Sequence, residues 1–204
     1  MKKMNIIQTY YEKNMGKGLP DHSVLGWESQ EAQRLRFDSL LSSVNPEGKK
    51  ILDVGCGMGN LLEYILEKGH RVSYTGTDIL QGMIESAEAK KLDADFYCVD
   101  IFKNNPFELG SFDIVYASGI FNLNLGNNRE FLLKAIELFL ALSRDVVAFN
   151  LLHHHSPDKE EEYYYFSPEE VLGMLEKYSG RIRKVNVIGN YLQNDFTVIC
   201  HKRK

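Results

Sequence analysis

A glycine-rich segment, Asp53 to Asn60, is the part of this 204-residue chain best suited to bind a ligand. Its glycines, Gly55, Gly57 and Gly59, let the backbone turn sharply and let a ligand approach it closely. A helix predicted to begin at Asn60 offers unpaired N–H groups in its first turn. Dinucleotide-binding proteins use a related loop, G-x-G-x-x-G. Asn60 occupies the sixth position here, so the spacing disfavours a nicotinamide dinucleotide.

Three aspartates recur where predicted strands end: Asp53, Asp78 and Asp100. Vicinal ribose hydroxyls are hydrogen-bond donors, and a carboxylate after the second strand can accept from both. Asp100 can accept in the same way from an adenine amino group. Capping of the next helix is the alternative role for each aspartate taken alone. Three of them in this order, beside a glycine loop, favour a ligand that contains a nucleoside.

Strand-like and helix-like apolar patterns alternate from residue 50 onwards, which predicts an α/β fold with a parallel sheet covered on both faces. The last two strands are joined by a short connection that suits an antiparallel hairpin, which we expect at the sheet edge. Ligands bind such sheets at the carboxyl ends of the strands. The predicted strands are 50–54, 71–77, 96–99, 112–117, 145–150, 184–188 and 196–200, and the predicted helices are 28–41, 60–68, 83–91, 130–142 and one opening at 167–170.

Four segments resemble the motifs of class I S-adenosylmethionine-dependent methyltransferases. Residues 51–60 resemble the first motif, 74–79 the ribose-binding segment, 96–102 the adenine-binding segment and 111–122 the fourth motif. The resemblance extends over residues 48–201. It implies a Rossmann-like fold with seven strands, of which the C-terminal one is antiparallel, and S-adenosyl-L-methionine as the cofactor.

The resemblance also implies a cofactor contact for each motif residue. The implied contacts are Asp53, Gly55, Cys56, Gly57, Gly59 and the backbone of Ser118 and Gly119 at the methionine end, Asp78 at the ribose, and Ile79, Asp100 and the Ile101 amide at the adenine.

Two ranges divide the chain in this interpretation. Residues 1–45 form an N-terminal lid or helical segment packed on the same domain, and residues 46–204 form the S-adenosylmethionine-binding domain. In families of this type the N-terminal part often covers the cofactor. Tyr11 or Arg36 is a candidate ligand of the cofactor carboxylate, and arginine suits that task through its bidentate geometry. An ordinary surface charge is the alternative for Arg36.

The lead-in around Trp27, with Gln33, Arg36 and Phe37, resembles that of a bacterial and archaeal methyltransferase subgroup of unassigned substrate. Trp27 is therefore a candidate substrate residue, with an anchor in the core or lid as its alternative. Phe121 and Asn122 are also candidate substrate residues. The alternative for both is that they only line the pocket. The fourth motif lacks Asn-Pro-Pro-Tyr, which argues against an adenine-N6 or glutamine acceptor.

No catalytic residue can be assigned from the sequence, and His153, His154 and His155 are weak candidates for a general base. Exposed loop residues are the alternative for all three. Consecutive side chains are not expected to face one ligand together, and no cysteine has C-x-x-C spacing, so we predict no metal site.

Composition bears on partners and location. The formal net charge of −4 disfavours a phosphate backbone, so we expect a small-molecule acceptor and no nucleic acid. Three cysteines without a pairing pattern indicate a reducing, cytoplasmic setting. No apolar run approaches the roughly 20 residues that span a bilayer, so no membrane partner is expected. The oligomeric state is left open.

The predicted function is therefore methyl transfer from S-adenosylmethionine to a small-molecule acceptor. A non-catalytic S-adenosylmethionine-binding or regulatory protein is the alternative, because binding does not prove turnover. A nicotinamide-dependent oxidoreductase is a weaker alternative.

Overall fold

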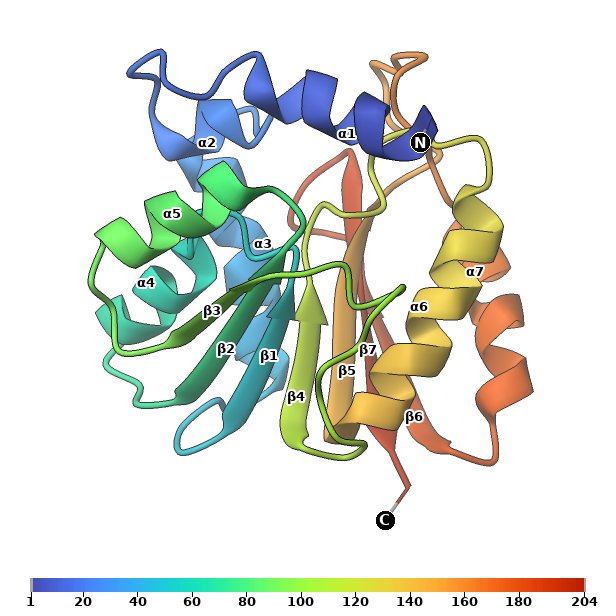
Figure 1. Ribbon diagram of the computed structural model, residues 1–204. Helices are drawn as coiled ribbons and strands as arrows, with labels where there is room; N and C mark the ends of the chain where they lie inside the picture. The colour runs from blue at the N-terminus through green and yellow to red at the C-terminus, as the bar shows by residue number, and fades with distance from the viewer. Residues whose placement is uncertain (1, 204) are drawn as a thin grey trace.

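A computed structural model describes residues 2–203 and shows a seven-stranded sheet with helices on both faces (Figure 1). No helix within residues 2–203 is long and apolar enough to cross a membrane. The strands are β1 (Lys50–Val54), β2 (Ser73–Asp78), β3 (Asp95–Cys98), β4 (Phe112–Ala117), β5 (Ser143–Leu152), β6 (Ile182–Ile188) and β7 (Asp195–Lys202). The helices are α1 (Lys2–Glu12), α2 (Asp21–Val24), α3 (Gln30–Ser43), α4 (Asn60–Glu67), α5 (Gln81–Ala89), α6 (Asn128–Leu142) and α7 (Pro168–Leu175), followed by a 3-10 turn, η1 (Glu176–Tyr178).

The strand order is β3-β2-β1-β4-β5-β7-β6. β7 runs antiparallel to β5 and to β6, and the other neighbouring strands pair in parallel. The Rossmann-like fold with an antiparallel C-terminal strand is thus confirmed. The strand order reverses beside β1, and this switch point is where sheets of this type bind ligands.

The antiparallel hairpin of β6 and β7 lies at the sheet edge, as expected, with β6 outermost and β7 between β5 and β6. The physical reason is burial. Most of β7 is buried along its length, whereas β6 is largely exposed or half-buried. A strand that is apolar on both faces is stabilised most inside the sheet, and a strand with charged residues suits an edge.

Alternate residues of the strands face two hydrophobic cores. Ile51 packs with α3 and α4 on one face, and Leu52 packs with α6 and α7 on the other. The connection from β3 to β4 contains no helix. Its Phe102 and Phe107 pack against the core that contains Leu52. Figure 1 shows this connection running over the face that α6 covers.

The N-terminal residues are more regular than the sequence suggested. Residues 1–45 are predicted as a lid or helical segment, and within them α1 alone spans 11 residues. Figure 1 shows α1 lying across the carboxyl ends of the strands. Ser29 caps the start of α3, because its side chain accepts a hydrogen bond from the Ala32 amide at 3.0 Å. The division of the chain at residues 45 and 46 stays a prediction.

A buried ion pair joins α3 to the start of β7. Arg36 on α3 contacts Asp195, and their side chains are 3% and 0% exposed. Arg36 also donates to the Ala32 carbonyl at 2.8 Å. Both sequence interpretations of Arg36 were therefore wrong. It is neither a surface charge nor a residue of the ligand cavity described below, because its guanidinium is committed to Asp195 in the interior.

We expect Arg36→Met to lower the free energy of unfolding by about 3–5 kcal/mol, because it leaves the Asp195 carboxylate buried and unpaired. Lys49→Met is the matched control. Lys49 pairs with Asp145 at 3.2 Å, but both side chains are 39% exposed, and such pairs contribute about 0–1 kcal/mol. Urea denaturation followed by circular dichroism measures both changes, and similar losses in the two variants would contradict the role given to the buried pair.

Candidate active site

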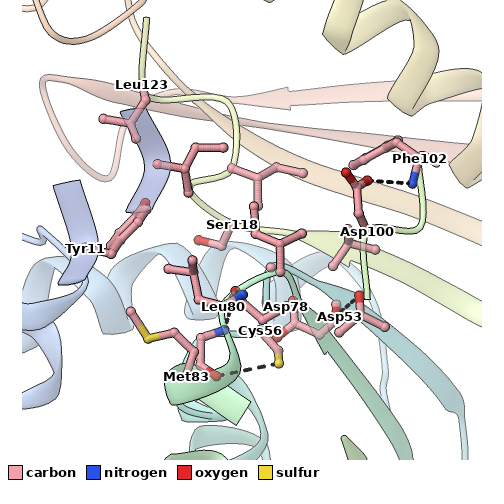
Figure 2. Close-up of a pocket in the computed structure, with 18 of the residues that line it drawn as sticks. Tyr11, Asp53, Cys56, Asp78, Leu80, Met83, Asp100, Phe102, Ser118 and Leu123 are labelled. Atoms are coloured by element: carbon pink, nitrogen blue, oxygen red, sulfur yellow. Dashed lines mark hydrogen bonds between the residues drawn. The ribbon is translucent and has the colours of Figure 1, made fainter. Parts of the chain in front are cut away.

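A cavity of about 710 Å³ lies at the switch point of the sheet. Its walls come from the segments that follow β1, β2, β3 and β4, from α1, and from the segment that leads into α3. Figure 2 shows Tyr11 of α1 and Asp100 on opposite sides of it. The volume is typical of sites that bind small molecules.

Two glycines of the loop after β1 line the cavity in backbone conformations that favour glycine. Gly55 has φ +76°, and a Cβ there would lie 2.1 Å from the Cγ2 of Ile120. Gly57 has φ +53°, and a Cβ there would lie 2.8 Å from the Cδ2 of Leu25. Ile120 and Leu25 are themselves cavity walls. The loop can therefore form this cradle only with glycine at both positions.

Gly59 has a different role from the other two glycines. A Cβ at Gly59 would meet Phe96 at 3.3 Å and Ala87 at 3.6 Å, on the protein side of the loop. Gly59 is not among the residues that line the cavity. The structure therefore supports a packing role for Gly59 rather than the implied cofactor contact. Cys56, by contrast, lines the cavity, and burial raises the pKa of its thiol.

Asp78 joins the loops after β1 and β2. Its carboxylate accepts hydrogen bonds from the Gly57 amide at 3.1 Å and from the Leu80 amide at 2.9 Å. A carboxylate has about four acceptor positions, so about two remain for a ligand. Burial raises the pKa of Asp78. The carboxylate is thus held in place by backbone amides, with room left to accept from a pair of ribose hydroxyls.

Asp100 is fixed in a similar way after β3. One carboxylate oxygen accepts from the Phe102 amide at 3.1 Å, and the other contacts the Lys103 ammonium at 2.6 Å. Lys103 is 70% exposed, so this ion pair lies at the rim of the cavity. Asp100 and Ile79 both line the cavity, as the resemblance implies. The Ile101 side chain lies in the core, and only its backbone can face a ligand.

Asp53 is the most enclosed acid of the site, at 4% exposure. Burial raises its pKa to about 7, against a hydrogen bond from the Tyr74 hydroxyl at 2.5 Å that lowers it, and the nearby charge of Asp78 adds to the rise. An ionised carboxylate in this position is stabilised by a positive charge in the cavity.

The charges around the cavity favour a cationic ligand. Three of its acids, Asp53, Asp78 and Asp100, are buried or half-buried, whereas its fourth acid, Glu130, and its lysines, Lys3, Lys103 and Lys134, are exposed. S-adenosylmethionine brings an ammonium and a sulfonium group to such a site, and the residues present fit it. The two phosphates of a nicotinamide dinucleotide would face the carboxylates instead.

α1 forms one wall of the cavity, within the range predicted as a lid or helical segment but without predicted bounds. Met4, Ile7 and Tyr11 all line the cavity. Their spacing of i, i+3 and i+7 places them on one helical face, and that pattern is the signal by which the sequence could have revealed the helix. The Tyr10 hydroxyl lies 2.6 Å from that of Tyr163, so a hydrogen bond links α1 to the connection between β5 and α7.

Trp27 lies between the ion pair and the cavity. The Arg36 guanidinium lies 4.3 Å from the centre of the Trp27 ring, and a Cβ on Gly119 would lie 2.9 Å from the Cη2 of Trp27. Trp27 and Gly119 both line the cavity. The Gly119 amide donates to the Asn150 side chain at 3.0 Å, which fixes the segment after β4. A substrate contact for Trp27 stays a prediction.

The two residues predicted beside Trp27 do not reach the cavity. Phe121 is 1% exposed and packs in the core against Phe131 and Phe149, so its candidacy as a substrate residue was wrong. The Asn122 amide donates to the Gly119 carbonyl at 3.1 Å, and its own carbonyl accepts from the Tyr164 amide at 2.7 Å. Asn122 therefore shapes the loop without lining the cavity. His153, His154 and His155 do not line it either.

Comparison with known proteins gives a family match for the middle of this chain. Residues 51–143 match the methyltransferase domain family. A probable 18S rRNA (guanine-N(7))-methyltransferase of Dictyostelium discoideum is 30% identical over 107 residues, which cover 52% of this chain and 36% of that protein. Demethylmenaquinone methyltransferase of Thermotoga maritima is 33% identical over 92 residues, which cover 45% and 39%. The chain thus matches well under half the length of these curated relatives.

The crystal structure of magnesium protoporphyrin IX methyltransferase from Synechocystis with bound S-adenosylmethionine has the same fold. The TM-score is 0.67 at 15% identity, over 100% of this chain and 98% of that one. The fold is thus the Rossmann-like fold that methyltransferases of this type share. The match to the methyltransferase domain family covers residues 51–143, somewhat less than half of the chain.

The comparisons correct the prediction about partners. We expected a small-molecule acceptor and no nucleic acid, yet several relatives are named for methylation of guanine in 18S rRNA. The error lies in the use of net charge. A net charge of −4 is a sum over the whole surface, whereas Lys3, Lys103 and Lys134 are exposed together at the rim of one cavity.

We expect Gly55→Ala to weaken binding of S-adenosylmethionine at least about tenfold, since a Cβ at this position cannot be placed without moving Ile120. Gly110→Ala is the matched control, because Gly110 has a similar φ of +63° but no atom within 4 Å of its Cβ position. Isothermal titration calorimetry measures both affinities. Equal weakening in the two variants would show that backbone strain alone is responsible.

We expect affinity for S-adenosylmethionine to rise about tenfold from pH 6 to pH 8. The pKa of Asp53 is about 7 without a ligand. A bound cation lowers that pKa, so binding releases a proton and is favoured as pH rises toward 7, with little further gain above it. Calorimetry in buffers of different ionisation enthalpy measures the proton released. The conservative variant Asp53→Asn should lose most of the pH dependence, and an unchanged slope in that variant would contradict the assignment.

Proposed function

We propose that this chain transfers a methyl group from S-adenosylmethionine to a nucleophilic acceptor that enters the cavity beside α1. The observation that carries the proposal is the convergence on one cavity of the glycine cradle, the enclosed Asp53 and the two remaining acceptor positions of Asp78. The anionic interior suits a cofactor that carries positive charge.

S-adenosylmethionine supplies the reactive methyl group, so the protein's task is to bind and orient. Asp78 would accept from the ribose hydroxyls, Asp100 from the adenine amino group, and Asp53 would face the positive charges of the methionine part. Tyr11 on α1 is suited to the methionine carboxylate as a hydroxyl donor. Alignment of the two reactants in such a site contributes about 7–11 kcal/mol at best.

The acceptor would approach past Trp27 and Tyr11. Trp27 is held between the Arg36 guanidinium and Gly119, so its ring is a fixed surface against which a flat acceptor can be placed. A carboxylate or thiolate acceptor needs no general base, whereas a hydroxyl or amine must lose a proton.

A reducing compartment suits the chain, because Cys56 and Cys200 are buried free thiols and Cys98 is exposed and free. We infer a cytoplasmic location on that ground.

Titration with S-adenosylmethionine, S-adenosylhomocysteine and NAD tests cofactor choice. We expect saturable binding of the two adenosyl ligands and at least about tenfold weaker binding in Asp78→Ala, since hydrogen bonds to a charged group contribute about 1.5–3 kcal/mol each. Asp145→Ala is the control, because Asp145 pairs with the exposed Lys49 away from the cavity. Preferential binding of NAD, or no binding of either adenosyl ligand, would overturn the proposal.

Turnover distinguishes an enzyme from a binding protein. Formation of S-adenosylhomocysteine is measured with separate panels of structured RNA and of phenolic or quinol compounds, which are the acceptor types that the relatives' names suggest. An acceptor-dependent rate that Asp78→Ala abolishes supports methyl transfer. Tight cofactor binding without turnover in any panel would favour the non-catalytic alternative.

A further inference from the structure

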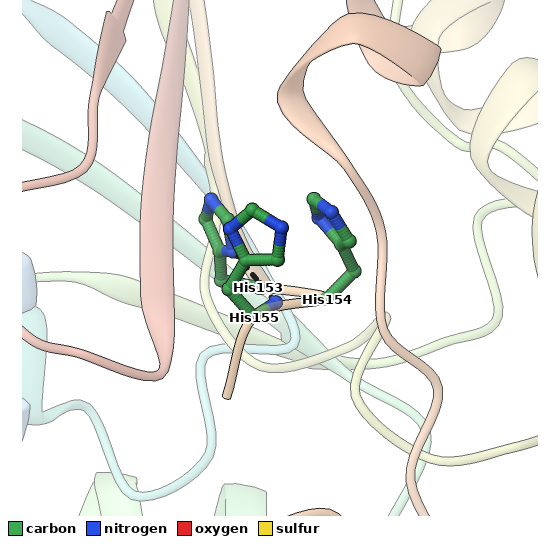
Figure 3. Close-up of side chains that lie close together, drawn as sticks. All are labelled: His153, His154 and His155. Atoms are coloured by element: carbon green, nitrogen blue, oxygen red, sulfur yellow. Dashed lines mark hydrogen bonds between the residues drawn. The ribbon is translucent and has the colours of Figure 1, made fainter. Parts of the chain in front are cut away.

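Three consecutive histidines, His153, His154 and His155, gather their rings at the end of β5 (Figure 3). One ligand nitrogen from each lies within 4.8 Å of the other two. The ring centres of His154 and His155 are 3.8 Å apart, and that of His153 lies 5.0 Å and 5.1 Å from them. The expectation that such residues cannot face one ligand together was wrong.

A tight turn explains the grouping. In a strand, consecutive side chains point to opposite faces. Here the Ser156 amide donates to the His153 carbonyl at 2.9 Å, which closes a four-residue turn with His154 and His155 at its centre. The chain therefore turns at His154 and His155, and the three rings come to the same side.

The backbone that carries the rings is fixed from two sides. The His153 amide donates to the Asn194 carbonyl at 2.8 Å, and the His154 amide donates to the Phe166 carbonyl at 2.8 Å. The His153 ring also packs against Phe196, with ring centres 5.4 Å apart. The cluster is thus built on the end of a central strand.

Only some of the ring nitrogens of the three histidines accept hydrogen bonds from other protein groups. The Nδ1 of His154 is buried and has no hydrogen-bond partner within residues 2–203. The Nδ1 of His153 accepts from the His155 amide at 2.9 Å. Glu169 and Lys159, one of each sign, lie near enough for their charges to act on the His153 imidazole.

We propose that His153, His154 and His155 bind one divalent transition-metal cation of the Zn²⁺ class, with solvent in the remaining positions. Imidazole suits Zn²⁺, Ni²⁺ and Cu²⁺, whereas Mg²⁺ and Ca²⁺ prefer oxygen ligands. Zn–N distances of about 2.0–2.1 Å place tetrahedral ligand atoms about 3.3–3.4 Å apart. Nitrogens already within 4.8 Å reach that spacing by rotation of the rings.

The metal must displace one hydrogen bond. A neutral ring whose Nδ1 accepts a hydrogen bond carries its proton on Nε2. If the metal binds Nδ1 of His153, it takes the place of the His155 amide. If it binds Nε2, the proton must move to Nδ1, which also ends that hydrogen bond. The His155 amide therefore changes its partner in either case, and its NMR signal reports binding.

The site is separate from the proposed cofactor site, since none of the three histidines lines the cavity. It lies at the start of the connection that carries Tyr163. A metal there would fix the turn between β5 and α7 without taking part in methyl transfer.

The test uses the full chain, freed of metal by a chelator and titrated with ZnCl₂ and separately with MgCl₂. We expect one Zn²⁺ per chain, no Mg²⁺ binding, a shifted His155 amide signal and at least about tenfold weaker Zn²⁺ binding in His154→Ala. Substitution with Co²⁺ adds a visible spectrum that reports the number of ligands.

His70→Ala is the matched control, because His70 precedes β2 at the opposite end of the sheet and lies 3.7 Å from Glu47. This variant should bind Zn²⁺ as the unaltered chain does, and circular dichroism checks that both variants fold. Absence of a one-to-one Zn²⁺ complex, or equal loss of affinity in His70→Ala and His154→Ala, would overturn the proposal.

Discussion

Asp53, Asp78 and Asp100 hold three buried or half-buried carboxylates around one cavity at the carboxyl ends of the parallel strands, and the local structure follows from the need to keep them there. Removal of an ionised carboxylate from water costs several kcal/mol unless hydrogen bonds or an opposite charge offset it. Asp78 has two backbone amides, Asp100 has an amide and an exposed lysine, and Asp53 has one phenol. The glycine loop serves this purpose as well as ligand access, because the Gly57 amide is one of the donors to Asp78. The negative charge of the three carboxylates is only partly offset by these groups. The remaining negative charge is the basis of the preference for a cationic ligand.

The alternation of strands and helices, the glycine loop and the three acids could be predicted because each depends on local pattern and on the rule that carboxyl ends of parallel strands share an edge. β1 and β4 have the predicted bounds, and the other predicted strands overlap the observed ones. The place of β7 could not be found from periodicity, since insertion between β5 and β6 depends on which strand can be buried on both faces. Length and continuity of the apolar run in β7 were the available signal.

The errors at the site share a physical cause. Arg36, Phe121 and Asn122 were assigned from their position near a motif, but side-chain direction decided their roles. Arg36 meets Asp195, which is 159 residues away along the chain, and no local pattern reports such a pair. For His153 to His155 the prediction was that consecutive side chains do not face one ligand together, and a single turn brings their rings together instead. The choice of methyl acceptor depends on the charge and shape of the surface at the cavity rim. The composition of the whole chain does not report these local properties.

The insertion of β7 between β5 and β6 has a consequence for the order of folding. β6 is synthesised before β7, yet it can join the sheet only through β7, because β5 and β6 are not neighbours. Until β7 is in place, the open edge of β5 exposes unpaired backbone groups, and Arg36 has no Asp195 to meet. The closing step therefore joins β7 to α3 across the 159 residues that separate Arg36 from Asp195, and closing so long a loop costs conformational entropy.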